Sequence, residues 1–428
     1  MYTMEKLQNQ LKTWRRDLHK RPELGWCEYE TTAYIYNVLK PLCFTLHLGN
    51  EVSSKDKMGV PSAEVDRLHF KRAEEAGIDA KLLEKMVGNQ TGLVATFDTG
   101  KSGKHIAYRF DIDALPIFES NDASHLPAKE GFRSIYDGQM HACGHDGHTA
   151  IGLGLAQLIH EHRNELNGAF TLIFQPAEEG VRGAKAIVEK GWLDHADYFL
   201  AGHIMGQPLG TVVPGVASAL ATTKLNVTFT GKSAHAGGSP EEGRNALLAA
   251  AQATVQLHSI PPHSQGATRL NVGTFHAGSG RNIIADRAEL ELETRGETTE
   301  LNAYMAENAK RIIRHTAQAS GVDYTLDLVG EGISAKSDPQ WLEIVKRALA
   351  ASDLVQKVSD RYEAIGGSED ATFMMERVQQ QGGLATYLLY GSTLAEKHHH
   401  PLFDYDERVL EIAVDSLWRL TVYLQQAS

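Results

Sequence analysis

The sequence has 428 residues, of which 42% are hydrophobic and 22% are charged, and its net charge is -12. This composition is typical of a globular protein and excludes a disordered, collagen-like or disulfide-scaffold chain. The length predicts two or three domains, since one domain usually takes about 150 residues. The acidic balance, without any Lys/Arg-rich run, argues against nucleic acid and anionic membranes as partners. Three widely spaced cysteines, and the lack of an apolar signal segment or membrane span, indicate a soluble protein of the reducing cytoplasm.

The chain is expected to begin with two helices. Residues 4–20 are predicted to form an amphipathic helix, because Leu11, Trp14 and Leu18 recur at helical spacing. A second helix is expected over 28–40. Residues 51–90 are polar, charged and helix-forming. They indicate a surface insertion that either covers another part of the molecule or is a solvated helical hairpin without a role.

The segments that follow alternate between short apolar strands and helices. Strands are expected at 92–97, 105–110, 171–175 and 198–204, and helices at 147–163 and 182–190. This alternation predicts an α/β domain with a mostly parallel sheet.

The pattern changes near residue 218 and returns near residue 331. A strand is expected at 223–231, and Ser239-Pro240-Glu241-Glu242 predicts a capped helix start, with the helix running to 258. Strands at 268–277, 286–295 and 322–329 and a helix at 300–319 complete a β-α-β-β-α-β order, which is typical of a ferredoxin-like unit. Helices at 339–351 and 406–425 then resume the first style. The sequence therefore predicts a discontinuous domain, 1–217 and 331–428, interrupted by an inserted α+β domain at 218–330.

The densest chemical signal is the segment Met140–His148, MHACGHDGH, which places Cys143 and His145 two positions apart in a glycine-flanked turn. Such a turn can direct a thiolate and an imidazole at one metal ion. Asp146 is expected to orient a histidine ligand from behind. Three histidines, a cysteine and an aspartate within nine residues are hard to explain by packing.

Other candidate ligands follow the predicted strands of the same domain. Each would be unremarkable alone: a Glu-Glu pair is usually a solvated turn, and a strand-end histidine usually belongs to the core. Together they supply enough ligands for two divalent cations about 3.5–4 Å apart, which would activate a water molecule toward an amide. They are Asp111 and Asp113, Glu178 and Glu179, His203, and the histidines 398–400.

The inserted domain carries polar residues that do not form a metal pattern. His235, Asn282 and Arg295 suit the binding of a substrate carboxylate or of an oxyanion. A thiol enzyme, with Cys143 as nucleophile and His145 as base, is the rival hypothesis, but it leaves the carboxylates and the other histidines without a task.

These residues lie in motifs that resemble the zinc- or manganese-dependent aminoacylase/carboxypeptidase amidohydrolases. Within that family the chain is most similar to the branch of auxin-conjugate, hippurate and p-aminobenzoyl-glutamate hydrolases. The matching motifs occur in the family's order over nearly the whole chain: DIDALP, MHACGHDGHTA, FQPAEEG, GKSAHAGGSPEEGRNAL, GSGRN, ETRG and GSEDAT.

The resemblance implies a role for each site residue. The metal ligands for two divalent ions, manganese or zinc, would be Cys143, His145, Glu179, His203 and His399, with Cys143 as the bridging thiolate. His398 competes with His399 for the last position. Glu178 would be the general base and the later proton donor, and Asp113 would orient a histidine ligand. His235 would stabilise the oxyanion from a lid, and Asn282 and Arg295 would hold the substrate's carboxylate.

The implied activity is hydrolysis of an N-acyl or N-aroyl amino acid, with p-aminobenzoyl-glutamate as the expected substrate. Two alternatives stay open: a different acyl amino acid, or a metal-binding subunit that needs a related partner for activity. A homodimer or a heteromer with a related subunit is expected, with the inserted domain serving as lid and dimerisation domain.

Overall fold

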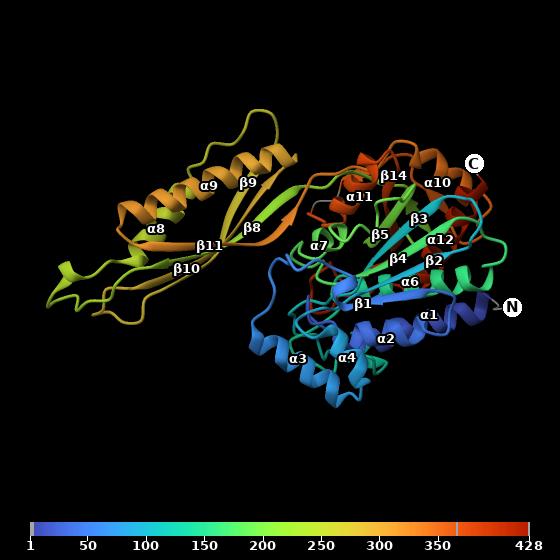
Figure 1. Ribbon diagram of the computed structural model, residues 1–428, viewed down its shortest axis with the longest axis horizontal. Coiled ribbons are helices and arrows are strands. Elements are labelled where there is room, and N and C mark those ends of the chain that lie inside the picture. The colour runs from blue at the N-terminus through green and yellow to red at the C-terminus, as the bar shows by residue number, and fades with distance from the viewer. Residues whose placement is uncertain (1–3, 365–366, 427–428) are drawn as a thin grey trace. The chain divides into compact units, whose positions relative to one another are not determined.

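The computed structural model describes residues 4–364 and 367–426, and its chain forms two compact units (Figure 1). Unit 1 comprises Met1–Ala217, Ala335–Ala364 and Asp370–Ser428. Unit 2 comprises Ser218–Ser334 and Ile365–Glu369. Unit 1 is therefore discontinuous in sequence, and most of unit 2 is one insertion.

Unit 1 is built on an eight-stranded mixed sheet with the order β1-β2-β4-β3-β5-β14-β6-β12. Its four central strands are parallel neighbours, so their carboxyl ends lie at one edge of the sheet. The expected α/β class with a mostly parallel sheet is confirmed. The strands are β1 Thr45–Leu48, β2 Leu93–Asp98, β3 His105–Asp111, β4 Ala169–Gln175, β5 Tyr198–Gly206, β6 Thr211–Val213, β12 Lys357–Val358 and β14 Leu384–Ser392; β7 Val216–Ser218 and β13 Glu363–Ala364 form a separate pair.

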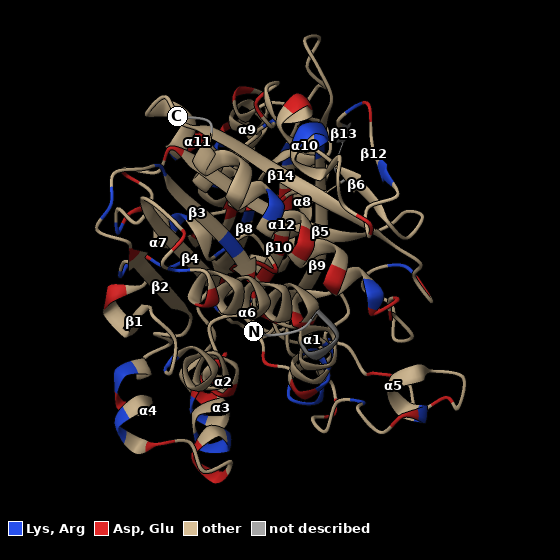
Figure 2. Ribbon diagram, turned by 90° about the vertical axis from the view of Figure 1, so that its right-hand side faces the viewer, with Lys and Arg blue, Asp and Glu red and all other residues tan. Residues whose placement is uncertain are grey.

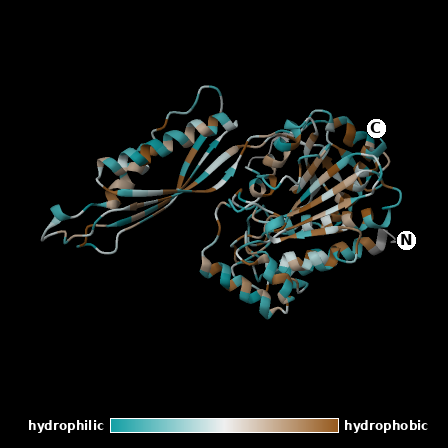
Figure 3. Ribbon diagram, viewed as in Figure 1, coloured by the Kyte–Doolittle hydropathy of each residue, from teal (hydrophilic) through white to brown (hydrophobic). Residues whose placement is uncertain are grey.

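Helices cover this sheet, and apolar side chains of the central strands and of these helices together form the main core. Figure 3 colours the ribbon by the hydropathy of each residue. Helix α6 lies very close to the sheet because Gly152 has no side chain: a Cβ there would come within 2.6 Å of Phe110. Helices α1 and α12 both pack against α6. Outside the segment 51–90, the helices of unit 1 are α1 Met4–Lys20, α2 Tyr29–Leu39, α5 Leu126–Lys129, α6 His145–Glu161, α7 Ala184–Val188, α10 Trp341–Leu349, α11 Ala371–Gln380 and α12 Arg408–Gln426.

The segment 51–90 is packed against the rest of unit 1 and is not a free hairpin. It holds the end of η1 (Gly49–Glu51), α3 (Ala63–Glu75) and α4 (Ala80–Met86), whose outer faces mix acidic and basic residues (Figure 2). Leu82, Leu83 and Met86 of α4 are buried. Of the two expectations for this segment, the covering one is the one observed.

Unit 2 has the predicted ferredoxin-like order, with an antiparallel sheet β11-β8-β10-β9. Both helices contribute to one core with Leu225, Phe229 and Leu290 of the sheet. The elements are β8 Ala221–Thr230, α8 Ala246–Leu257, β9 Thr268–Ala277, β10 Arg287–Gly296, α9 Thr299–Ala319 and β11 Asp323–Gly332.

The predicted helix start at Ser239 is wrong. Pro240–Glu242 forms only a short 3-10 turn, and Ser239 makes no capping bond. Arg244 exchanges backbone hydrogen bonds of 2.9 Å with Lys232, so the chain is extended at that point. Helix α8 begins afterwards, where the Asn245 side chain accepts from the Leu248 amide at 3.1 Å. A local capping pattern is overridden here by pairing with an earlier segment of the chain.

Within residues 4–364 and 367–426, no helix is both long and apolar enough to cross a bilayer.

A buried ionic network joins α1 to the start of α6. Arg15 donates to Asp146 at 2.9 Å, and the two ring nitrogens of His19 lie 2.8 Å from Asp146 and 2.9 Å from Glu119. Burial alone would lower the pKa of His19, but its hydrogen bonds to Asp146 and Glu119 outweigh it and raise the pKa to about 9. His19 is therefore protonated at neutral pH, as the two carboxylates require.

The raised pKa of His19 predicts a loss of stability at alkaline pH. The folded protein holds this proton more tightly than the unfolded chain, so the contribution is complete below pH 6.5 and is lost as the pH rises toward about 9. The free energy of unfolding should fall by up to about 3 kcal/mol over this interval through His19 alone. Urea denaturation at pH 6.5 and at about pH 9 should show a smaller fall in the free energy of unfolding for His19→Gln than for the parent. The partly exposed control His162→Gln should behave like the parent. An unchanged fall in His19→Gln would contradict the assignment.

Candidate metal centre

The candidate site lies at the carboxyl edge of the parallel strands of unit 1. Asp113 follows β3, Glu178 and Glu179 follow β4, His203 lies on β5, and His399 lies in the loop after β14. Cys143 and His145 enter from the amino end of α6, where Gly144 takes a left-handed φ of 98°. Open α/β sheets build their sites at this edge because the strand ends converge there.

His145 presents a single free ring nitrogen to the site. Its Nδ1 donates to the backbone oxygen of Asp113 at 2.9 Å and also lies 3.3 Å from the Asp113 carboxylate. The Nε2 atom is buried and, among the described residues, has no hydrogen-bond partner. It lies 3.7 Å from a carboxylate oxygen of Glu178. An imidazole fixed through Nδ1 with a bare Nε2 is the usual state of a histidine metal ligand.

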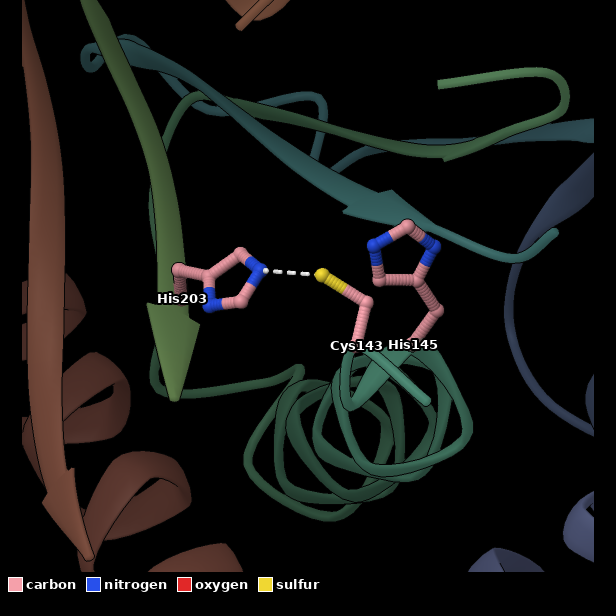
Figure 4. Close-up of side chains that lie close together, drawn as sticks. All are labelled: Cys143, His145 and His203. Carbon is pink, nitrogen blue, oxygen red and sulfur yellow. Dashed lines mark hydrogen bonds between the residues drawn. The ribbon is translucent and has the colours of Figure 1, made fainter. Parts of the chain in front are cut away.

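Cys143 and His203 face each other across the same space (Figure 4). The Cys143 Sγ atom lies 3.4 Å from His203 Nε2. His203 donates through Nδ1 to the Ile204 carbonyl at 2.7 Å, which leaves the lone pair on Nε2 directed at the sulfur. Burial, with the neighbouring His148 and His398, holds the pKa of His203 well below its usual value, so the ring is neutral.

Cys143 is a poor nucleophile in this environment. Burial, reinforced by the charge of Glu179, raises the pKa of the thiol well above its usual value. Reactive cysteines need the opposite, a pKa lowered by neighbouring positive charge. A cation bound among these side chains would supply that charge. The thiol-enzyme hypothesis therefore lacks the lowered thiol pKa that it requires. Binding of a cation by the thiolate would itself provide the positive charge that stabilises the deprotonated form.

The turn after β4 carries both carboxylates and is held by other side chains. Asp113 accepts from the amides of Glu178 at 3.1 Å and Glu179 at 2.9 Å. The Arg182 side chain donates to the Glu179 carbonyl at 2.8 Å and to the Gly59 carbonyl of the insertion at 2.8 Å. Within the described residues, one oxygen of Glu179 is buried without a hydrogen-bond partner.

The two competing histidines of the C-terminal loop have different neighbours. The Nε2 atom of His398 lies 3.0 Å from the Ile204 carbonyl, so it is used as a donor. His399 Nε2 instead lies 3.5 Å from Glu179 Oε1, and His399 groups with Cys143 and Glu179 as possible ligands. Its amide donates to Ala142 at 2.8 Å, and it takes a left-handed φ of 65°. Strained backbone of this kind is concentrated at functional sites.

Asp111 serves as an internal counter-ion. One oxygen lies 2.6 Å from Arg109 and the other 2.6 Å from His148 Nδ1. Burial would raise the pKa of Asp111, but His145, His148 and Arg109 together hold it well below its usual range. With both oxygens engaged, Asp111 is less suited than the other candidates to bind a metal.

Two supporting residues had no predicted role or a different one. His148 accepts from the Ile204 amide at 3.0 Å through Nε2, and so links α6 to the strand that carries His203. Its position three residues after His145 was the available signal. Asp146, expected to orient a histidine ligand, is bonded to Arg15 and to His19, which is not a candidate ligand. Asp113 takes the orienting position instead.

The remaining predicted residues lie in unit 2. The backbone of Ala236, next to His235, bonds to the Asn282 carbonyl at 3.0 Å. The His235 ring accepts through Nδ1 from the amides of Gly237 at 3.1 Å and Gly238 at 2.9 Å, so its proton lies on the exposed Nε2. Arg295 pairs with Glu293 of its own strand at 2.9 Å.

The donor set of unit 1 fits divalent metal ions. Several sets of three side chains place ligand atoms within 4.8 Å of one another, including Cys143 with His145 and His203, and Cys143 with Glu179 and His399. The buried, unpartnered atoms of His145 and Glu179 are the kind of polar group that a bound cation would satisfy. Thiolate, imidazole and carboxylate donors together suit zinc or another transition ion.

Comparison with known proteins places the chain among hydrolases. The family model described as "Peptidase family M20/M25/M40" matches residues 107–422. An indole-3-acetyl-aspartic acid hydrolase of Enterobacter agglomerans is 48% identical over 410 residues, covering 95% of this chain and 94% of its own length. A p-aminobenzoyl-glutamate hydrolase subunit of Escherichia coli (strain K12) is 47% identical over 411 residues, covering 96% of this chain and 94% of its own.

Two solved structures are similar to this chain over nearly its whole length. An aminobenzoyl-glutamate utilization protein from Klebsiella pneumoniae has a TM-score of 0.84 and 42% identity, covering 98% of this chain and 96% of its own. The Bacillus subtilis YXEP protein, described as a dinuclear metal binding peptidase, has a TM-score of 0.66 and 26% identity, covering 99% of this chain and 100% of its own.

The geometry predicts that His399, and not His398, contributes to metal binding. His399→Ala should weaken the binding of at least one ion by about 10-fold or more, because it removes a ligand nitrogen. His398→Ala is the matched control, since its Nε2 is occupied by a carbonyl. Isothermal titration with Mn²⁺ and Zn²⁺ measures both. Weakened binding in His398→Ala with normal binding in His399→Ala would reverse the assignment.

Proposed function

This chain belongs to peptidase family M20/M25/M40 and is a metal-dependent amidohydrolase, and from that premise we propose that it cleaves an aromatic N-acyl amino acid, p-aminobenzoyl-glutamate or a close analogue. The observation that carries the proposal is the convergence of Cys143, His145 and His203 beside the adjacent carboxylates Glu178 and Glu179. That arrangement offers metal ligands and a proton-transferring carboxylate in one place.

The substrate class follows from the two curated relatives. One is named for indole-3-acetyl-aspartic acid and the other for p-aminobenzoyl-glutamate, so both names join an aromatic acyl group to an acidic amino acid. Because the chain is about equally identical to both relatives, the comparison supports this class of substrate more strongly than it supports either of the two compounds. We take p-aminobenzoyl-glutamate as the first substrate to test, because the similar Klebsiella pneumoniae structure is also named for aminobenzoyl-glutamate.

The proposed metal content is two divalent ions, manganese or zinc, held by Cys143, His145, Glu179, His203 and His399. When bound, such ions supply Lewis acidity toward a carbonyl oxygen and a water molecule. Glu178, 3.7 Å from His145 Nε2, is placed to take a proton from the attacking water and to return it to the leaving nitrogen. Hydrogen bonds to Asp113 hold His145 and the backbone of both glutamates in position during this transfer.

Residues of unit 2 complete the proposal. His235 can donate from Nε2 to the oxyanion of the tetrahedral intermediate, because its Nδ1 is occupied by two amides. Asn282 and Arg295 are proposed to hold the substrate's carboxylate, for which Arg295 would exchange its pairing with Glu293. In this scheme unit 2 supplies oxyanion stabilisation and carboxylate binding, and unit 1 supplies proton transfer.

The location and assembly of the chain are part of the same proposal. All three cysteines, each within the described residues, are unpaired, which suits a reducing cytoplasm. Helix α8 carries an apolar stripe in which Leu248 and Val255 are exposed and Ala251 between them is half-buried, and β9 is an edge strand of its sheet. We propose that this surface pairs with a second copy; a related partner chain is the alternative, because one relative is named as one part of a hydrolase with more than one kind of chain.

The catalytic proposal is tested by glutamate release from p-aminobenzoyl-glutamate. The purified chain, stripped of metal and reloaded with Mn²⁺ or Zn²⁺, should release glutamate only when reloaded. Glu178→Ala should lower kcat by about 100-fold or more while binding the same ions, since general acid–base catalysis contributes about 10²- to 10⁴-fold. The exposed Glu165→Ala serves as control. Full activity in Glu178→Ala would refute the mechanism, and inactivity of the loaded parent on all aromatic acyl-aspartates and acyl-glutamates would refute the substrate class.

The assembly proposal predicts a change in mass on charging the α8 stripe. Val255 is 74% exposed, so Val255→Glu should leave the fold intact and disfavour an apolar interface. Light scattering at micromolar concentration should give a dimer for the parent and a monomer for the variant. Leu68→Glu, at another exposed leucine on α3, should stay dimeric. A monomeric parent would contradict the proposal.

A further inference from the structure

The turn that carries Glu178 and Glu179 has an unusual backbone. Ala177 has φ 53° and Val181 has φ 59°, although neither is glycine. L-residues avoid this left-handed region because their Cβ atom crowds the following carbonyl, so the turn has to be held by its surroundings. Asp113 accounts for the amides of residues 178 and 179. It does not account for Ala177.

A remote carboxyl group holds Ala177. Glu28, fully buried in the segment before α2, accepts from the Ala177 amide at 2.8 Å. Its second oxygen accepts from the Thr91 hydroxyl at 2.6 Å. The Ala177 side chain packs in a small cluster with Trp26 and Ala186. The residue before the proposed base is thus fixed at its amide by Glu28 and at its methyl group by packing.

Glu28 occupies a helix-capping position without capping the helix. It is the N-cap residue of α2, yet its side chain makes no capping bond there. Glu23 does so instead: its two oxygens accept from the amides of Glu30 at 3.1 Å and Thr31 at 2.8 Å. The two buried carboxyl groups therefore divide two tasks. Glu23 stabilises the start of α2, and Glu28 is free to reach the turn.

We propose that Glu28 is a positioning residue, which sets the direction of the Glu178 carboxylate by holding Ala177 in the left-handed conformation. The inference rests on the proposed role of Glu178 as the proton-transferring group. Glu28 acts on the amide that precedes Glu178, whereas the Asp113 bonds to His145 and Glu179 do not involve it. Removing Glu28 therefore disturbs proton transfer and leaves metal binding and substrate recognition in place.

The conservative replacement is defined by the state of the carboxyl group. Burial, and then the charge of Asp113, raise the pKa of Glu28 to about 8. An uncharged amide of the same size is thus a close mimic at neutral pH. Glu28→Gln keeps an oxygen for the Ala177 amide. Its NH2 group faces the Thr91 hydroxyl, which then accepts the hydrogen bond that it donates in the parent. Glu28→Asp keeps the acidic group but is one methylene too short to reach the Ala177 amide without backbone movement.

The experiment compares kcat, KM, metal affinity by titration and melting temperature for Glu28→Ala, Glu28→Asp, Glu28→Gln and the control Glu23→Ala. We expect Glu28→Ala and Glu28→Asp to lower kcat by about 10- to 100-fold, the cost of misplacing a catalytic group by about 1 Å. KM and metal affinity should stay within about twofold of the parent, and Glu28→Gln should retain most of kcat. Glu23→Ala should lower the melting temperature with little change in kcat.

A second variant tests the conformational part of the proposal. Glycine adopts positive φ without strain, so adding Ala177→Gly to Glu28→Asp should recover part of the lost kcat. Parent-like kcat in Glu28→Asp, equal losses of kcat in Glu28→Asp and Glu23→Ala, or loss of metal affinity with kcat would each overturn the proposal. If Glu28→Ala does not fold, Glu28→Asp and the double variant decide. Full activity of Glu178→Ala would instead overturn the role of Glu178 itself, which is a separate result.

Discussion

Asp113 holds three parts of the candidate metal centre in fixed relation to one another. Its backbone oxygen and its carboxylate both accept from Nδ1 of His145, and the carboxylate also accepts from the amides of Glu178 and Glu179. This one buried residue therefore connects the end of β3, the start of α6 and the turn after β4. The unbonded ring nitrogen of His145 and the backbone of both glutamates are thereby positioned by a single residue. The other features of the centre are arranged around this connection: the left-handed turn, the arginine that ties it to the insertion, and the histidine links to β5.

Charged side chains in the interior make this arrangement rigid. Arg109 bonds to Asp111, Gln175 and Asp370, and the other oxygen of Asp370 accepts from the amides of Gly183 and Ala184. Each of these buried charges has an opposite charge or several hydrogen bonds, which is the condition under which such groups persist in a core. The turn with both carboxylates is consequently held at its two ends by separate acidic residues, Glu28 and Asp370.

Most of the fold could be predicted from sequence because hydrophobic periodicity reports local structure. Helix 4–20 and strand 268–277 coincide with α1 and β9. Predictions failed where distant parts of the chain decide. The start of α8 is set by pairing between Arg244 and Lys232, and the two-residue strand β12 exists only through its partner β6.

At the site, residue types with metal-binding chemistry were recognisable in the sequence. The different hydrogen-bond partners of His398 and His399, the partners of Asp146 and the contact of Glu28 with Ala177 were not recognisable, because each depends on a three-dimensional neighbour far away in the chain.

The order in which unit 1 is assembled from the chain has a consequence for its synthesis. Unit 2 is encoded almost entirely by one continuous stretch, so it can fold while the ribosome is still translating. Unit 1 cannot, because β14 belongs to the middle of its sheet and the loop after β14 brings His399. Cys143, His145 and His203 therefore cannot lie next to His399 until the C-terminal part of the chain has been made. The candidate metal centre is thus completed only late in synthesis.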